Sequence, residues 1–598
     1  MKNVIGLRSF AVALLLNNVG ACVNNERSET PEHVAQPEIR QSANGVLSTT
    51  LEAVLATNSV LDADTGLETV VETPTYEGRL TGPTLRVKPG DRLEIEVINS
   101  FPSNPEQSRR GAFPHEPYTT NLHTHGLTVS PQGIGDNPFR DMLPETSNAF
   151  EVEIPEFHRA GTFWYHPHKH GSVAFQFFGG MAGFLIVDGG PGTIDEVPEI
   201  RAAADILMAF QAIRVDENGR VPWLDTEATQ FARGGAYSTY INSTVHITTN
   251  GRSTPTHKMR PQEVQRWRLL NAASGMTIVI LVQGTEFNII ALDGISLPEM
   301  LTLPVGFPLV LGAGNRADVL VKAPATGTYL LQAIDPVDTM YSVSPQGVAP
   351  GVRRVRLGGD FPDPTYPATL ATIVVEGPPL EMPLPTGPLP GSIEPISTQD
   401  LLAAAPDVTR RVAFENCGQQ GNMSNPDQRL PSCEYYFDRY DADYWGGLPF
   451  HNLLMLRDAD DDGEPVDPVN PSGSHTNYRK EGLFTADQSL FDDMRAGNIE
   501  EWTVINRNMA DHSFHIHQNP FLLTHINGQP LREPEWRDTI LVPGATGGGG
   551  GINAAGYGTV TFRTYLHPDH LGKILAHCHI LTHGDFGMMQ MLEIRPEE

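Results

Sequence analysis

The chain has 598 residues, which is too long for a single hydrophobic core and predicts about three or four domains. It contains 57 glycines, 49 prolines and many short segments that alternate apolar with polar residues, a pattern typical of an all-β protein with long connections. The net charge of -30 argues against nucleic acid or an anionic membrane surface as a partner.

Residues 1–22 have the features of an export signal. Two basic residues precede an apolar run at residues 10–16, which is too short to span a bilayer but sufficient for the core of a signal peptide. The small residues before Cys22 resemble a bacterial lipobox, in which the cysteine is lipidated and becomes the mature N-terminus. Two asparagines interrupt the apolar run, so cleavage before an unmodified Cys22, or nearby, is the alternative. We expect export to the bacterial periplasm or cell surface, with a lipid anchor at Cys22.

One strand pattern occurs three times along the chain. Residues 87–99, 259–271 and 494–506 share their length and their alternation, have a basic residue second, and end with two aliphatic residues and Asn. Three copies predict three β-domains. Polar, glycine-rich and proline-rich stretches suggest the following division: a disordered linker at 23–50, a first domain at 51–190, a second at 195–375, a semi-rigid Pro-rich linker at 376–395 and a third domain at 396–598.

Two pairs of histidines lie in the first domain. His123 and His125 form one pair, and His166 and His168 form the other. Residues two apart share a face of an extended segment, so each pair can present two imidazoles on the same side. Either pair alone is weak support, because such pairs commonly bind nothing or a loose zinc ion. Together in one domain they predict a metal cluster.

A second landmark recurs late in each domain, at residues 161–168, 327–334 and 572–579. When the three copies are aligned on their first glycine, the outer two carry histidine at the same two positions. The middle copy carries Gln332 and Ile334 there. We therefore predict that the middle domain is a spacer that holds no metal.

Residues 511–517 place histidines on both faces of an extended segment. His515 and His517 share one face of an extended segment, and His512 has the opposite parity. This arrangement offers one imidazole to one site and two imidazoles to another.

Residues 577–588 combine a thiolate, three imidazoles and a thioether. Cys578, His583 and Met588 supply three of the four ligands of a blue copper, which takes two imidazoles, a thiolate and a weak axial thioether. If Cys578 ends a strand, side-chain alternation turns its two histidine neighbours to the opposite face. A buried free cysteine in a His-rich loop, or a zinc site, is the alternative. The four stretches together give two histidines to the blue site and leave eight for a cluster between the first and third domains.

These stretches resemble the four copper signatures of three-domain multicopper oxidases, which are HxHG, HxH, HxxHxH and HCHxxxHxxxGM. All four are complete and in family order, over about residues 75–598. This family includes laccases, bilirubin oxidases and bacterial cuprous oxidases. The resemblance implies an all-β fold of three cupredoxin-like Greek-key β-sandwich domains and four coppers per chain. It assigns the type 1 copper to His512, Cys578, His583 and Met588, the type 2 copper to His123 and His515, and the type 3 pair to His125, His166, His168, His517, His577 and His579.

The resemblance also implies an oxidoreductase. A small reducing substrate would give up single electrons at the type 1 copper, and dioxygen would be reduced to water at the trinuclear cluster. Cys578, His577 and His579 would be catalytic residues that carry electrons from the type 1 copper to the trinuclear cluster. In the family, an acid just beyond the first HxH supplies protons, and Asp136 matches it here, although a simple turn aspartate is the alternative. We expect a monomer with dioxygen and the reducing substrate as its partners, and no nucleic acid.

Several alternatives remain open at this stage. The sequence has no Met-rich insert of the kind found in cuprous oxidases, which favours a phenolic or other organic donor over Cu(I) or Fe(II). A non-enzymatic copper carrier would need the blue site but not eight further histidines, and a copper nitrite reductase lacks the HCH arrangement. Cys417 and Cys433 lie close together in a polar loop, and in an exported protein we expect them to form a disulfide.

Overall fold

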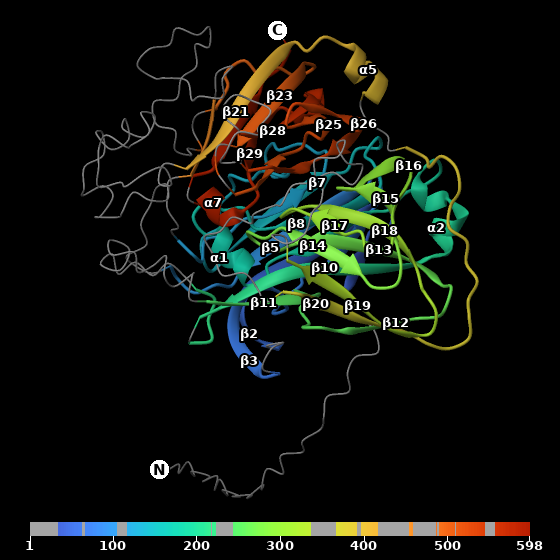
Figure 1. The fold of residues 1–598 in the computed structure, drawn as a ribbon. Coiled ribbons are helices and arrows are strands. Elements are labelled where there is room, and N and C mark those ends of the chain that lie inside the picture. The colour runs from blue at the N-terminus through green and yellow to red at the C-terminus, as the bar shows by residue number, and fades with distance from the viewer. Residues whose placement is uncertain are drawn as a thin grey trace, which may run out of the picture.

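The chain folds into three β-sandwiches that follow one another in sequence, as Figure 1 shows from blue through green to red in a computed structural model. The residues described are 34–61, 66–104, 116–216, 218–222, 243–335, 366–391, 396–416, 454–458, 486, 489–506, 508, 510–544, 557–585 and 587–597. The strands of these residues form six sheets, which confirms the prediction of an all-β fold.

The first sandwich packs a four-stranded sheet, in the order β3-β2-β5-β7, against a five-stranded sheet, in the order β1-β4-β9-β8-β6. Its strands are β1 (Ile39–Gln41), β2 (Val46–Leu61), β3 (Glu68–Tyr76), β4 (Thr84–Val87), β5 (Arg92–Asn99), β6 (His123–His125), β7 (Thr146–Glu153), β8 (Gly161–His166) and β9 (Gly183–Val187). Helix α1 (Val173–Phe178) follows β8 and is buried along its whole length.

The second sandwich packs a six-stranded sheet, β11-β10-β13-β18-β15-β16, against a five-stranded sheet, β12-β20-β19-β14-β17. Short helices η1 (Ile194–Glu196) and α2 (Pro198–Ala202) lead into it. Its strands are β10 (Ala204–Val215), β11 (Thr244–Thr249), β12 (Thr256–Met259), β13 (Val264–Asn271), β14 (Ile278–Val282), β15 (Phe287–Leu292), β16 (Ile295–Leu303), β17 (Leu309–Leu311), β18 (Arg316–Lys322), β19 (Gly327–Ile334) and β20 (Ala368–Val375).

The third sandwich packs β22-β21-β23-β28-β25-β26 against β27-β24-β29-β30. Its strands are β21 (Val408–Asn416), β22 (Leu454–Asp458), β23 (Ile499–Asn506), β24 (His512–Ile516), β25 (Phe521–Ile526), β26 (Gln529–Arg537), β27 (Thr539–Val542), β28 (Gly558–Tyr565), β29 (Gly572–Cys578) and β30 (Met589–Ile594). Its helices are α5 (Thr398–Ala403), η3 (Pro568–His570) and α7 (Leu581–Asp585). Among the described residues, no helix has the length and hydrophobicity needed to cross a membrane.

The three sequence repeats occupy the same place in the three sandwiches. Each contains a strand, β5, β13 or β23, that pairs in parallel with the first long strand of its domain and antiparallel with a later one. The asparagine that ends each repeat is fully buried and makes the same three hydrogen bonds. In each domain Nδ2 donates to two backbone carbonyls and Oδ1 accepts from the N–H two residues on, for Asn99, Asn271 and Asn506 alike. The repeated Asn thus fixes the loop that follows the strand through hydrogen bonds to its backbone.

The expectation of a disordered linker at residues 23–50 is wrong for its described part. Residues 39–41 form β1, which pairs in parallel with β4, and β2 begins at Val46 and pairs in parallel with β5. The physical reason is that the two faces of β2 differ: Leu47 and Leu51 are buried in the core of the first sandwich, whereas Ser48 and Thr50 on the other face are exposed. The first sandwich therefore begins before residue 51, and residues 1–33 lie outside the described part.

The Pro-rich segment after β20 lies along the second sandwich without forming a strand in its described residues, 376–391. The N–H groups of Leu380 and Met382 donate to carbonyls of the loop before β13, and the N–H of Leu389 donates to the carbonyl of Pro298. The segment is therefore fixed to the middle domain where it is described.

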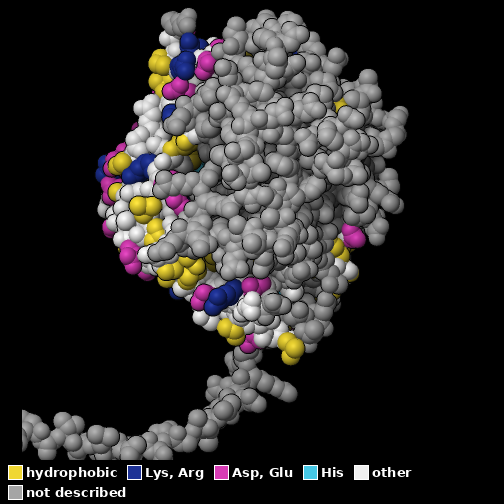
Figure 2. All heavy atoms as spheres, turned by 90° about the vertical axis from the view of Figure 1, so that its left-hand side faces the viewer, with side chains coloured by type: hydrophobic (Ala, Val, Ile, Leu, Met, Phe, Trp, Pro, Cys, Tyr) yellow, Lys and Arg dark blue, Asp and Glu magenta, His cyan; other side chains and the backbone are white. Residues whose placement is uncertain are grey.

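The face shown in Figure 2 mixes acidic, basic and apolar side chains over its described part. Apolar packing continues between domains, since one core cluster joins Trp164 and Phe177 of the first sandwich to Phe514 and Leu581 of the third. The same cluster includes Cys578.

Candidate metal centre

Two strand pairs bring the histidines together. In the first sandwich β6 pairs antiparallel with β8, and His123 lies opposite His166. In the third, β24 pairs antiparallel with β29, and His515 lies opposite His577. Cys578 is the last residue of β29, so its neighbours on either side turn away from it.

Among the described residues, four groups have nitrogen or sulfur atoms close enough to share a metal ion. They are His123, His125 and His515; His125, His166 and His579; His168, His517 and His577; and His512, Cys578 and His583. All ten histidines predicted from the sequence lie in these groups, and every member is buried. The three all-histidine groups each take residues from both the first and third sandwiches.

The histidine nitrogens that face one another have few other partners. Nε2 of His168 lies 3.0 Å from Nε2 of His577 and 3.2 Å from Nε2 of His517. In other members of the groups one nitrogen is held and the other has no hydrogen-bond partner: His166 donates Nδ1 to the carbonyl of Pro167 while its Nε2 is unpartnered. Buried nitrogens without hydrogen bonds are costly unless a metal ion takes them up. The donor set therefore fits bound metal.

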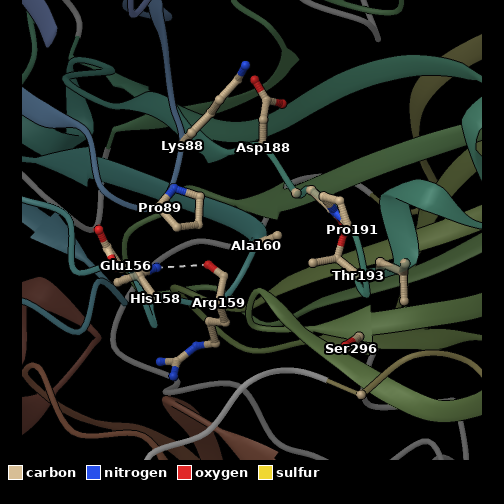
Figure 3. A pocket seen from close by; sticks show the side chains of 14 residues that line it. Lys88, Pro89, Glu156, His158, Arg159, Ala160, Asp188, Pro191, Thr193 and Ser296 are labelled. Atoms are coloured by element: carbon tan, nitrogen blue, oxygen red, sulfur yellow. Dashed lines mark hydrogen bonds between the residues drawn. The ribbon is translucent and has the colours of Figure 1, made fainter. Parts of the chain in front are cut away.

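A histidine outside these groups provides the contrast. His158 lines a cleft of about 320 Å³ together with Lys88, Arg159 and Asp188 (Figure 3). Its Nε2 accepts from the N–H of Thr128 at 2.9 Å, and its Nδ1 donates to the carbonyl of Arg159 at 2.8 Å. Both nitrogens are used, so His158 is a structural histidine and the cleft contains no member of the four groups.

Burial sets the protonation of the clustered histidines. Desolvation, reinforced by neighbouring imidazoles, lowers the pKa of His123, His168 and His517 well below the usual range. Burial also lowers the pKa of His166 to about 3 and that of His515 to about 4. The imidazoles are consequently neutral at pH 7, which is the form that binds metal.

The fourth group has the soft donors of a blue copper site. Nδ1 of His512 lies 3.3 Å from Sγ of Cys578, Nδ1 of His583 lies 3.7 Å from the same sulfur, and the two nitrogens are 3.1 Å apart. His512 is held from behind by Nδ2 of Asn508, 3.0 Å from its Nε2. Met588 is buried, and its carbonyl accepts from the N–H of Cys578 at 3.0 Å. Two imidazole nitrogens and a thiol that converge in this way match copper better than zinc or a harder ion.

Asp136 lies beside the first all-histidine group. Its carboxylate accepts from Nδ1 of His123 at 3.0 Å, from the N–H of Thr124 at 2.8 Å and from Nε2 of Gln518 at 2.7 Å. Burial raises the pKa of Asp136 to about 7, although the hydrogen bonds from Thr124 and Gln518 oppose the rise. Asp136 is therefore a buried carboxyl in contact with the cluster rather than a surface turn residue.

Asp538 is a second acid at the cluster, and the sequence analysis did not identify it. Its Oδ1 lies 3.5 Å from Nε2 of His125, and its carbonyl accepts from Nδ1 of His515 at 2.7 Å. Burial alone would raise the pKa of Asp538, but the Arg316 guanidinium beside it holds that pKa below the usual range. The available signal was weak: an acidic residue that directly precedes the apolar strand β27.

Asp585 connects the blue site to the first sandwich and was also not identified from the sequence. It ends α7, the helix that carries His583, and its carboxylate accepts from the N–H groups of Gly171 and Ala174 at 2.5 and 2.9 Å. These residues follow His168 closely. The carboxylate thus fixes the two metal-binding segments to each other across the domain boundary.

Fold and site together define a cupredoxin-like protein that binds copper, with a Cys-His site and a histidine cluster at one domain boundary. Three family models described as multicopper oxidase match residues 62–191, 222–347 and 464–598. The chain belongs to the multicopper oxidases, a family of oxidoreductases that use oxygen.

The relatives cover different shares of the chain. Laccase-2 from Trametes versicolor is 23% identical over 534 residues, which are 85% of this chain and 84% of that protein. Multicopper oxidase mco from Staphylococcus aureus is 29% identical over 113 residues, which are 19% of this chain, so the chain spans only 21% of the length of that relative. Among solved structures, the Campylobacter jejuni multicopper oxidase described as a metallo-oxidase has a TM-score of 0.59 at 21% identity and covers 95% of this chain and 97% of its own. This last similarity supports the fold.

Proposed function

We propose that this protein couples one-electron oxidation of a small reducing substrate to four-electron reduction of dioxygen to water. The observation that carries the proposal is that three all-histidine groups lie next to a Cys-His site. The two sites are joined at the end of β29, where His577 and His579 flank Cys578. A carrier of single electrons needs only the second of these. The proposal assigns four coppers per chain to the site.

The ligand roles follow from the groups. His512, Cys578 and His583 would hold the type 1 copper, with Met588 as its axial ligand. The type 2 copper would take His123 and His515. The type 3 pair would take one complete all-histidine group each: His125, His166 and His579 for one ion, and His168, His517 and His577 for the other.

When bound, copper supplies the change of oxidation state that accepts single electrons and passes them to dioxygen. The chain supplies the connection, because Cys578 is covalently bonded to both His577 and His579, which belong to two different all-histidine groups. Burial keeps bulk water away from these residues. Asp136 would deliver protons, since it is a buried carboxyl in direct contact with His123.

Copper stoichiometry and oxygen uptake test this function. We expect about four copper ions per chain, a blue absorption band, a type 2 signal in electron paramagnetic resonance, and oxygen consumption without release of hydrogen peroxide. One copper per chain and no oxygen uptake would instead identify an electron carrier.

For the substrate, we propose a phenolic or other organic donor, because the sequence has no Met-rich insert. Oxygen uptake by copper-loaded protein should be measured in parallel with a phenol, bilirubin, Cu(I) and Fe(II). Turnover of Cu(I) or Fe(II) far above that of the organic donors would make the protein a metallo-oxidase and contradict this assignment.

The location and the processing of the chain are further proposals. We propose export of a monomer to the periplasm or cell surface with a lipid on Cys22, a residue outside the described part. Cys22→Ala should release the protein from membranes, and equal membrane association of both forms would exclude the lipid.

Cys417 and Cys433 also lie outside the described part, and we propose that they form a disulfide. Thiol labelling of denatured, unreduced protein should leave both unlabelled if they form a disulfide, which would stabilise the chain by about 3 kcal/mol.

A further inference from the structure

Arg316 lies where the three sandwiches meet. It is the first residue of β18 in the middle domain, and no part of it is exposed to solvent. Its Nε donates to the carbonyl of Thr162 in the first sandwich at 3.1 Å. Two further N–H groups donate within its own domain, to the carbonyls of Gly314 at 3.1 Å and Asp293 at 3.0 Å.

The remaining two donors of Arg316 reach the third sandwich. Nη1 donates to Oδ1 of Asp538 at 2.8 Å, and Nη2 donates to Oδ2 of the same carboxylate at 2.5 Å. A guanidinium has five N–H donors, and here all five have partners. The two parallel bonds fix both the position and the plane of the Asp538 carboxylate, as paired Arg–carboxylate contacts do.

Asp538 in turn holds two histidines of the cluster by the nitrogens that face away from the shared centre. Its Oδ1 lies 3.5 Å from Nε2 of His125, and the hydroxyl of Thr539, which donates to that Oδ1 at 2.9 Å, lies 3.2 Å from the same Nε2. Its carbonyl accepts from Nδ1 of His515. The opposite nitrogens, Nδ1 of His125 and Nε2 of His515, have no hydrogen-bond partner. Contacts of this kind set the tautomer and ring orientation of a metal-binding histidine.

Beyond the function proposed above, on which this inference rests, we propose that Arg316 is a positioning residue for the histidine cluster. It fixes Asp538 and, through Asp538, the orientation of His125 and His515. The middle sandwich carries none of the metal-binding residues among its described parts, yet it takes part in the site through the side chain of Arg316.

A purely structural role is the competing explanation, and the chain offers a matched control for it. Arg268 belongs to the neighbouring strand β13 of the same sheet, is 2% exposed, and is also bound at the boundary with the first sandwich. It donates to Asp205 at 2.6 Å and to the hydroxyl of Thr162 at 2.9 Å. It also donates to Asp318 at 3.2 Å, and none of these three partners belongs to the histidine groups. Loss of Arg268 should therefore reproduce the structural cost without disturbing the cluster.

The experiment compares Arg316→Met and Arg316→Lys with Arg268→Met and Arg268→Lys in full-length, copper-loaded protein. The readouts are copper per chain, blue absorbance, the type 2 signal in electron paramagnetic resonance and the melting temperature. In Arg316→Met we expect a changed or lost type 2 signal with unchanged blue absorbance, because the Cys578 site does not contact Asp538. Arg316→Lys should restore the signal in part, since it keeps the charge but cannot form two parallel bonds to one carboxylate.

The Arg268 variants should lower the melting temperature and leave the type 2 signal as in wild type. A wild-type signal in Arg316→Met, with only the melting temperature reduced, would overturn the proposal. If Arg316→Met yields no folded protein, Arg316→Lys decides: an unchanged type 2 signal there overturns the proposal, and a shifted one supports it.

A further arm tests the route through Asp538. Adding Arg316→Lys to Asp538→Asn should change the type 2 signal no further than Asp538→Asn alone, and additive changes would exclude that route. The wild-type protein separates this inference from the proposed function. Absence of any type 2 signal in copper-loaded wild type would contradict the function itself, whereas a normal wild-type signal that the Arg316 variants leave unchanged contradicts only the role of Arg316.

Discussion

Gln518 of the third sandwich donates its side-chain amide to Oδ2 of Asp136 in the first, at 2.7 Å. Gln518 follows His517 directly and has a left-handed backbone with φ at 57°, a conformation that is costly for a residue other than glycine. The turn places its amide against Asp136 in the interior. The acid beside His123 is thus held from both domains.

Asp136→Asn should leave copper content, blue colour and reduction of the blue copper by substrate unchanged. Asparagine keeps the shape of the side chain but has no proton to give, and general acids contribute about 10²–10⁴-fold to rates. We therefore expect reoxidation by oxygen to slow by about that factor, as measured by stopped-flow recovery of the blue band. Asp141→Asn, an exposed acid of the same domain, is the control and should behave as wild type. Wild-type turnover of Asp136→Asn at every pH in the active range would assign proton delivery to another group.

Cys578→Ser should abolish both the blue colour and oxidase turnover. The thiolate is the ligand that gives the colour, and it stands between His577 and His579 in the chain. The three all-histidine groups do not include this sulfur, so most of the remaining copper should still bind. Metal analysis and the visible spectrum measure both effects. Retention of the blue band in this variant would disprove the assignment of the site.

Met588→Leu should give a blue, folded protein with a higher reduction potential. Met588 is fully buried, so leucine of similar size should be tolerated in the core. A weak thioether donor stabilises oxidised copper, and an aliphatic side chain cannot do so. Redox titration of the blue band is the measurement, and an unchanged potential would show that Met588 only fills space.

Asn271→Ala should destabilise the middle sandwich without changing the copper sites. The change leaves the carbonyls of Met276 and Leu311 and the N–H of Ala273 without this partner in a buried loop. Each unsatisfied buried group costs about 1–3 kcal/mol. Urea denaturation should therefore show a loss on the order of 2 kcal/mol or more. Gln283→Ala removes an exposed side-chain contact in the same domain and should have little effect, because water can replace it.

The sequence was sufficient for the features that depend on short-range spacing. The parity of His512 against His515, and of Cys578 against its neighbours, is a property of any extended strand, so both could be predicted before the strands were known. The three sandwiches could be predicted because one strand pattern recurs three times in the sequence. The structure explains why Asn ends each copy, since this buried residue makes the same hydrogen bonds in each domain.

The features that the sequence analysis missed depend on long-range contacts. Asp538 reaches His125 across 413 positions of the chain numbering, and Arg316 reaches Asp538 from another domain, so no local pattern relates them. The beginning of strand β2, residues 46–50, was assigned to a linker for a different reason, since its outward face is polar enough to resemble a linker when its pairing with β5 is unknown.

The division of the histidine groups between the first and third sandwiches has a consequence for how the protein acquires its metal. No all-histidine group is complete within one domain, so neither domain alone can hold these ions in the arrangement described. The Cys578 group, by contrast, lies wholly within the third domain. Loading should therefore be ordered: the blue site can fill as soon as one domain has folded, whereas the cluster can fill only after two folded domains have docked. Bound metal would then act as a cross-link between them, and its removal should loosen that boundary first.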